Sequence, residues 1–164
     1  MPAPDQLDFA LLNRQLAALL ADEPDPLANT ANFVALLYNA MPDINWLGVY
    51  VVRGNELVLG PFQGKPACVR LPLGKGVCGT AAARRETLRI DDVDAFAGHI
   101  ACDPASRAEI VVPLVPGGKL VGVLDIDSPT ARRFSQRDQD GIESLCRTFS
   151  ETLYAKAGDA ALFI

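Results

Sequence analysis

Hydrophobic residues recur with a helical period at both ends of the chain. Two amphipathic helices are predicted near the N-terminus, and their apolar stripes are Leu12, Leu16, Leu19 and Leu20, and then Phe33, Leu36, Leu37 and Ala40. The second helix is expected to begin at Asp25-Pro26, because aspartate is a favoured N-cap and proline fits the first helical turn. A third, long helix is predicted after Ser135, which has capping-box spacing to Asp138, and its stripe is Ile142, Leu145, Cys146, Phe149 and Leu153. Cys146 is therefore expected to be a small core residue.

Between these helices the apolar residues alternate, which predicts β-strands. Six strands are expected, over residues 44–52, 56–62, 67–71, 87–90, 109–115 and 119–127. Pro116-Gly117-Gly118 is predicted to close a tight hairpin between the last two. A short helix of small residues, 77–85, and an irregular stretch, 91–107, interrupt the strands. This order predicts an α+β domain in which the N- and C-terminal helices cover one face of a central antiparallel sheet, and the other face holds a ligand pocket.

The composition fits one soluble domain. The chain has 164 residues, 49% of them hydrophobic, so we expect a single domain over residues 1–164 with its core at about 26–156. Its net charge of -5 disfavours nucleic acid or an anionic membrane surface as a partner. No apolar stretch reaches the roughly 18 residues of a membrane span and no leader segment is visible, so a cytoplasmic location is expected. Thiols are reduced in that compartment, where cysteines that matter are more often catalytic, redox-active or metal-binding than structural.

Alternation along the strands places polar groups on the face away from the helices. Trp46 and Tyr50 fall opposite the aliphatic residues of their strand, where they can wall a small ligand or simply lie under covering loops. Asp125 and Asp127 share a face of the last strand, about 7 Å apart, and Glu109 opens the neighbouring strand. If the register aligns them, the three carboxyls line one pocket, and at least one has a raised pKa that suits it to bind an ammonium group or deliver a proton. A solvated sheet edge is the alternative.

Three cysteines, Cys68, Cys78 and Cys102, lie close together in a glycine-marked part of the chain. Cys102 falls in the loop segment GHIACDP, where His99 or Arg107 can favour its thiolate. Cys78 lies near the start of the short helix, whose dipole also lowers a thiol pKa, and Cys68 alternates out of a strand. Each cysteine alone is most simply a small buried residue, but the three together indicate redox chemistry. A zinc site of the three cysteines and His99 is the competing interpretation, although it lacks a C-x-x-C pair.

Several segments together resemble the free methionine-(R)-sulfoxide reductases, a family of GAF-domain enzymes. The resemblance covers roughly residues 46–143 and rests on WLGVY, GPFQGKPACVRLPLGKGVCGTA, GHIACD, RAEIVVPL and GVLDIDSP. It implies that Cys102 is the nucleophile, Cys68 the resolving cysteine, and Cys78 a further redox cysteine that can also pair with Cys102. It also implies a GAF-like fold whose substrate pocket is formed by Trp46, Tyr50, Glu109, Asp125 and Asp127.

The implied reaction matches the chemistry of these residues. Free methionine sulfoxide carries an ammonium group that a peptide-bonded residue lacks, so an acidic pocket selects the free amino acid. A Cys102 thiolate attacks the sulfoxide sulfur while a carboxyl donates to the oxygen, and the resulting sulfenic acid condenses with a second thiol to a disulfide. The family implies thioredoxin or a similar dithiol as reductant and requires no metal or organic cofactor, and amphipathic terminal helices are compatible with a homodimer. The alternative is a non-catalytic GAF sensor of a small ligand or of oxidation.

Overall fold

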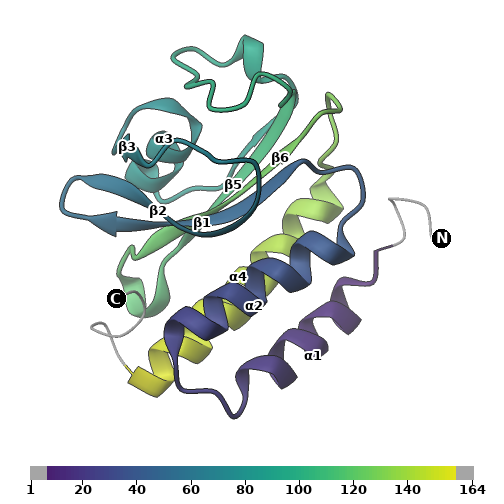
Figure 1. Ribbon diagram of the computed structural model, residues 1–164, viewed down its shortest axis with the longest axis vertical. Coiled ribbons are helices and arrows are strands. Elements are labelled where there is room, and N and C mark those ends of the chain that lie inside the picture. Colours follow the sequence, from purple (N-terminus) through teal and green to yellow (C-terminus); the bar gives the residue numbers. More distant parts are fainter. Residues whose placement is uncertain (1–6, 158–164) are drawn as a thin grey trace.

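A six-stranded antiparallel sheet separates two unlike layers of the molecule (Figure 1). The computed structural model describes residues 7–157, so the ends of the predicted 1–164 domain lie outside the described residues. The strands are β1 (Trp46–Arg53), β2 (Glu56–Gly64), β3 (Arg70–Pro72), β4 (Leu88–Ile90), β5 (Ala108–Leu114) and β6 (Gly122–Ser128). They lie in the order β3-β2-β1-β6-β5-β4. The middle of the sheet is therefore formed by β1 and β6, which are far apart in the sequence.

Three helices cover one face of the sheet, as predicted. They are α1 (Phe9–Leu20), α2 (Pro26–Ala40) and α4 (Gln136–Ala157). Helix α2 contacts β1 and β2, α4 contacts β5, and α1 packs mainly on the other two helices, farthest from the sheet (Figure 1). The rings of Phe33 and Phe149 stack at 4.1 Å between their centroids in the core of this layer. Within the described residues, no helix has both the length and the apolar character needed to cross a bilayer.

The helix starts follow the predicted capping pattern. The Asp25 side chain accepts a hydrogen bond from the backbone N–H of Ala28, with Pro26 in the first turn of α2. Ser135 and Asp138 cap α4 reciprocally, since each side chain accepts from the other residue's backbone N–H. Cys146 is buried in the helix-side core, as expected, and burial raises the pKa of its thiol above the usual range.

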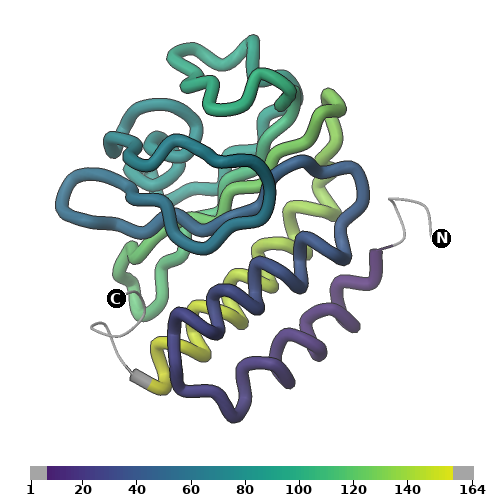
Figure 2. The backbone as a smooth tube through the Cα atoms, viewed as in Figure 1, coloured from purple at the N-terminus to yellow at the C-terminus, as the bar shows by residue number. Residues whose placement is uncertain are grey.

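The opposite face of the sheet carries helix α3 (Gly76–Arg84) and two irregular segments. One segment, residues 65–69, leads into β3, and the other, residues 91–107, leads into β5 and contains a short 3-10 helix at Val93–Ala95. Figure 2 shows the path of both segments, with residues 91–107 looping out beyond one end of the strands. A second apolar cluster lies beneath them and includes Tyr50, Leu57, Val77, Val111 and Val123. The second layer is thus built largely from loops, which is where binding residues are most often found.

Two of the predicted strand boundaries are wrong. The tight hairpin at Pro116-Gly117-Gly118 is absent, because β5 ends at Leu114, β6 begins only at Gly122, and the connection contains a 3-10 turn. A Cβ at Gly117, whose φ is 59°, would lie 2.7 Å from the ring of Tyr154, so space as well as backbone conformation favours glycine there. The strand predicted over residues 67–71 is reduced to Arg70–Pro72, and Cys68 lies in the loop before it.

Candidate active site

A pocket opens on the loop-covered face of the sheet. Its walls come from β1, β5 and β6, from the first turn of α3, and from the segments 65–69 and 91–107. Seven of the eight predicted site residues line it: Trp46, Tyr50, Cys78, Cys102, Glu109, Asp125 and Asp127. The eighth, Cys68, does not line the pocket but is bonded to Cys102 at its edge. The predicted placement of a pocket opposite the terminal helices is confirmed.

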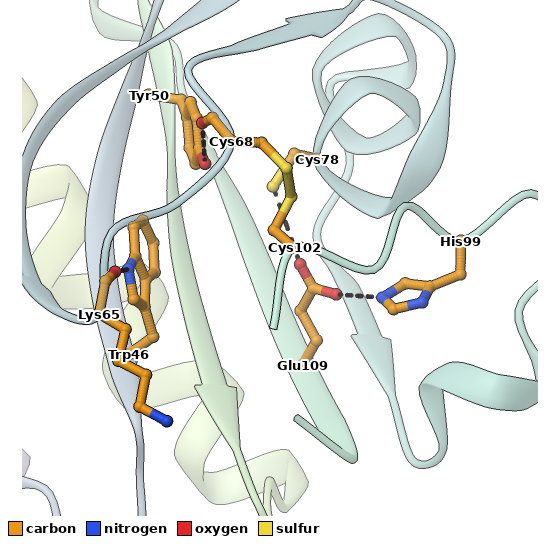
Figure 3. Close-up of a disulfide and its surroundings, with 8 residues drawn as sticks. All are labelled: Trp46, Tyr50, Lys65, Cys68, Cys78, His99, Cys102 and Glu109. Atoms are coloured by element: carbon orange, nitrogen blue, oxygen red, sulfur yellow. Dashed lines mark hydrogen bonds and ion pairs between the residues drawn. A yellow bond between two sulfur atoms is a disulfide. The ribbon is translucent and has the colours of Figure 1, made fainter. Parts of the chain in front are cut away.

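A disulfide joins Cys68 to Cys102 and ties together the two loop segments that frame the pocket (Figure 3). The Cα atoms are 5.6 Å apart, and both residues are partly exposed. Cys78 is outside the disulfide and buried, with its Sγ donating to Glu109 Oε1 at 3.8 Å. Of the two pairings that the resemblance leaves open for Cys102, the structure contains the one with Cys68.

The sheet register brings the three carboxyls together as expected. Glu109 on β5 pairs directly with Asp127 on β6, and Asp125 lies two residues before Asp127 on the same face. Glu109 and Asp125 are buried, which rules out the solvated-edge alternative for these two groups. Among the described residues, Asp125 Oδ1 has no hydrogen-bond partner. A buried acceptor without a partner is costly, and it is the kind of group that a bound ligand would satisfy.

Burial raises the pKa of all three carboxyls. Burial, reinforced by the charge of Asp127, raises the pKa of Glu109 to about 8. Burial and the neighbouring Glu109 raise the pKa of Asp125 well above its usual range, and burial together with Asp125 and Asp103 does the same for Asp127. The expectation that at least one carboxyl has a raised pKa is confirmed. Near neutral pH the cluster can therefore hold a proton and donate it.

The expected thiol activation at Cys78 is wrong. Cys78 is the third residue of α3, close to the positive end of the helix dipole. It is also 5% exposed and lies beside Asp125 and Glu109. Burial first, and then these carboxyls, raise the pKa of the Cys78 thiol well above its ordinary value. Desolvation outweighs the helix dipole here, and Cys78 is held as a neutral thiol.

His99 and Arg107, the two groups expected to favour the Cys102 thiolate, lie beside the acidic side chains of Glu109 and Asp92. His99 Nε2 is 3.7 Å from Glu109 Oε2 (Figure 3), and Arg107 Nη2 is 3.8 Å from Asp92 Oδ2. The alternative zinc site is incompatible with this disulfide form, because two of its four ligands, Cys68 and Cys102, are bonded to each other. Donor atoms of Cys78, Glu109 and Asp125 lie within 4.8 Å of one another, a spacing that would suit a cation.

The two predicted aromatic residues have a second role besides walling the pocket. Trp46 Nε1 donates to the backbone carbonyl of Lys65 at 3.1 Å, and the Tyr50 hydroxyl donates to the carbonyl of Cys68 at 2.9 Å (Figure 3). The Trp46 ring also stacks on Tyr50 and on Phe62, with centroids 5.8 and 5.4 Å away. Their polar groups therefore hold the 65–69 segment, and with it Cys68, over the sheet.

Several lining residues were not identified from the sequence, and they are Lys65, Lys75, Ile100, Asp103 and Ser106. Asn45, at the edge of this region, donates from Nδ2 to Asp103 Oδ2 at 3.3 Å and to Ser106 Oγ at 3.2 Å, and so anchors the chain just after Cys102. Asp103 could have been found from its position next to Cys102. The others lie in loops or at element ends, where hydrophobic periodicity gives no signal.

The carboxyl cluster predicts how stability depends on pH. Glu109 has a pKa of about 8 in the folded protein against an ordinary 4.5, so between these values the folded state retains a proton that the unfolded chain has released. The stabilisation is complete below about pH 4.5 and is lost as the pH rises through 8; Asp125 and Asp127 act in the same direction. We expect the free energy of urea unfolding of the disulfide form to fall over this range, by up to about 1.4 kcal/mol per pH unit for each group.

Asn substitutions test this dependence. Asp125→Asn should flatten the slope, whereas Asp94→Asn, at an exposed carboxyl, should leave it unchanged. A wild-type profile that is level from about pH 5 to 8.5 would contradict the assignment.

Comparison with known proteins identifies the family of the chain. A GAF domain matches residues 13–153. The chain is 53% identical over 145 residues to the free methionine-R-sulfoxide reductase of Escherichia coli, covering 88% of each chain. The structure of the free methionine-R-sulfoxide reductase of Neisseria meningitidis in complex with its substrate superposes with a TM-score of 0.89 at 40% identity, covering 95% of this chain and 94% of that one.

A putative GAF sensor protein of Burkholderia vietnamiensis is also similar, with a TM-score of 0.91 and 55% identity over 96% of this chain and 100% of that one. The domain match, and the relatives that are highly identical over most of the chain, together identify the family. The chain belongs to the GAF-domain family and, within it, to the free methionine-R-sulfoxide reductases.

Proposed function

We propose that this protein reduces free L-methionine-(R)-sulfoxide to methionine, with Cys102 as the nucleophile and Cys68 as the resolving cysteine. The observation that carries the proposal is the partly exposed Cys68–Cys102 disulfide beside a pocket with three carboxyls whose pKa values are raised by burial, so that the cluster can share a proton and still hold negative charge. A thiol that attacks a sulfoxide needs a proton donor for the departing oxygen, and this pocket places both in one space.

The charge of the pocket supports selection of the free amino acid. Asp127 and Asp103 line the same space as the buried pair Glu109 and Asp125. The α-ammonium group of a free amino acid is a cation of the size that such a cluster accommodates, and a peptide-bonded sulfoxide lacks it. The unpartnered Asp125 Oδ1 would gain a donor from the substrate or from its protonated neighbour. Trp46 offers an apolar wall for the methyl end of the side chain.

The reaction begins with a reduced pair of thiols. The Cys102 sulfur attacks the sulfoxide sulfur, a protonated carboxyl of the cluster donates to the oxygen, and oxygen passes to Cys102 as methionine leaves. Cys102 is then a sulfenic acid. The Cys68 thiol displaces its hydroxyl as water, and the Cys68–Cys102 disulfide forms. Glu109, with a pKa of about 8, is the carboxyl best suited to be protonated and still able to release its proton near neutral pH.

Recycling requires two electrons from outside the chain. A dithiol such as thioredoxin supplies them by exchange with the partly exposed disulfide, and Cys68 and Cys102 return to thiols. Cys78 stays a neutral, buried thiol beside Glu109 throughout this cycle. We therefore assign the first resolving step to Cys68 rather than to Cys78.

Substrate selectivity tests the proposal. Methionine release is expected from free methionine-R-sulfoxide under dithiothreitol, with little or none from the S epimer or from an N-acetylated, peptide-amide sulfoxide. The capped substrate has no ammonium group for the carboxyl cluster, which is the reason for its exclusion. Equal rates on the free and capped R forms would contradict the assigned role of the carboxyls.

A redox or ligand sensor is the second candidate function, and the description of the Burkholderia relative as a putative GAF sensor favours it. A sensor would bind a small ligand in the pocket without converting it. Protein with its thiols confirmed reduced that binds methionine sulfoxide but releases no methionine would support this candidate over the reductase.

A further inference from the structure

Exposed apolar side chains flank the disulfide. In the part of the chain that the structure describes, five large hydrophobic residues are exposed, and they are Leu11, Leu19, Leu27, Val69 and Ile100. Three are on helices α1 and α2, on the far side of the sheet. Val69, 58% exposed, directly follows Cys68, and Ile100, 37% exposed, lies two residues before Cys102. Each half of the disulfide therefore has an exposed aliphatic side chain beside it in the sequence.

Two basic side chains lie at the edge of the pocket, outside its acidic lining. Lys65 and Lys75 are exposed at the edge of the pocket, although the net charge of the protein is -5. Neither lysine forms an ion pair or a side-chain hydrogen bond within residues 7–157. Arg70, by contrast, is paired with Glu56. Two lysines without an ion-pair partner, together with the exposed aliphatic residues, form a surface suited to a partner that is apolar or acidic around its reactive group.

The disulfide itself indicates what that partner is. Its sulfurs belong to partly exposed residues, and the proposed reaction cannot repeat until an external dithiol reaches them. We propose that Val69 and Ile100, with Lys65 and Lys75 beside them, form the docking surface for a protein dithiol reductant of the thioredoxin type, one whose reactive cysteine lies in an apolar, uncharged or acidic surface. This inference rests on the proposed function and adds to it the surface that the reductant recognises.

Docking brings about two successive exchange steps. A thiolate of the reductant attacks one sulfur of the Cys68–Cys102 bond, forming an intermolecular disulfide and releasing the other cysteine as a thiolate that takes up a proton. The second thiol of the reductant then attacks the reductant's first sulfur in the intermolecular disulfide and breaks that bond. The reductant leaves with an internal disulfide, and both cysteines of this chain are thiols. Two electrons pass from the reductant, and no other co-reactant is needed. A small dithiol performs the same exchange without requiring a surface.

That difference provides the experiment. Turnover of free methionine-R-sulfoxide is measured with thioredoxin, thioredoxin reductase and NADPH, and in parallel with dithiothreitol. Val69→Asp should lower kcat/KM for thioredoxin about tenfold or more and leave the dithiothreitol-driven rate unchanged, because Val69 does not line the pocket. Leu27→Asp is the matched control: it introduces the same charge at a 61% exposed leucine on α2, and the thioredoxin rate should stay at the wild-type value.

Ile100→Ser extends the test to the second aliphatic residue. Ile100 also lines the pocket, so the substitution can change the chemical step as well as docking. The rate of the variant with thioredoxin is therefore divided by its rate with dithiothreitol, and this ratio should be lower for Ile100→Ser than for the wild type. A thioredoxin kcat/KM for Val69→Asp equal to that of Leu27→Asp, or an equal fall with both reductants, would overturn the docking surface and leave the reductase activity standing. Absence of methionine release from the wild type under dithiothreitol would instead overturn the proposed function, and the docking surface with it.

Discussion

Cys102→Ser should release no methionine from free methionine-R-sulfoxide, even in a single round with excess protein. Serine at this position cannot attack the sulfoxide sulfur at a useful rate, so we expect a loss of at least about 10^4-fold, typical of removing a nucleophile. The pocket remains, because Trp46, Glu109 and Asp125 are held by the sheet rather than by the disulfide. Binding of the substrate, measured by isothermal titration, should therefore persist while chemistry is lost.

Two matched variants separate the roles of the other cysteines. Cys68→Ser should release one methionine per chain and then stop or turn over slowly, because Cys102 still attacks but has lost the thiol to which it is bonded in the structure. Cys146→Ser, in the helix-side core away from the pocket, should leave the single-round yield unchanged. Equal single-round release from Cys102→Ser and the wild type would show that another group is the nucleophile.

Glu109→Gln has the second largest expected effect, a fall in kcat/KM of about 10^2 to 10^4, the usual contribution of a general acid. Glutamine keeps the shape of the side chain and can accept from Cys78, but it cannot transfer a proton. In the wild type, a pKa of about 8 keeps Glu109 protonated at neutral pH, so the rate should decline as the pH rises above about 8. That decline, measured in the chemical step, should be missing from the residual activity of Glu109→Gln.

The control for this variant is Glu86→Gln, at an exposed position just beyond the end of α3, which should retain both the rate and the alkaline decline. If Glu109→Gln kept the wild-type decline above pH 8, the proton donor would have to be another member of the cluster. Asp125→Asn would then be the variant expected to lose it.

The carboxyl cluster could be predicted from the sequence because it depends only on strand alternation and hairpin pairing. Asp125 and Asp127 are two residues apart on one face of β6, and Glu109 lies near the start of the antiparallel neighbour β5, so alternation predicts the shared face and the observed register, with Glu109 opposite Asp127, brings the three together. The same rule separated Trp46 and Tyr50 from the helix-side core.

The loop geometry could not be predicted in this way. Whether Cys78 is activated depends on the balance between a helix dipole and burial beside two acids, and only the tertiary packing of α3 against β5 and β6 shows that burial prevails. The anchoring of Asp103 by Asn45 is likewise a contact between residues 58 positions apart, with no periodic signal in either segment. The connection after β5 could not be predicted for the same reason, since the ring of Tyr154 on α4 leaves no room for a side chain at Gly117.

The most direct test of the whole account is a single round without reductant. Protein with all cysteines reduced is mixed with excess free methionine-R-sulfoxide, methionine is quantified, and the products are digested without reduction and examined by mass spectrometry. One methionine per chain is expected, together with a disulfide between the peptides containing Cys68 and Cys102, while Cys78 and Cys146 remain thiols. Methionine release without that disulfide, or with one between Cys78 and Cys102, would contradict this expectation.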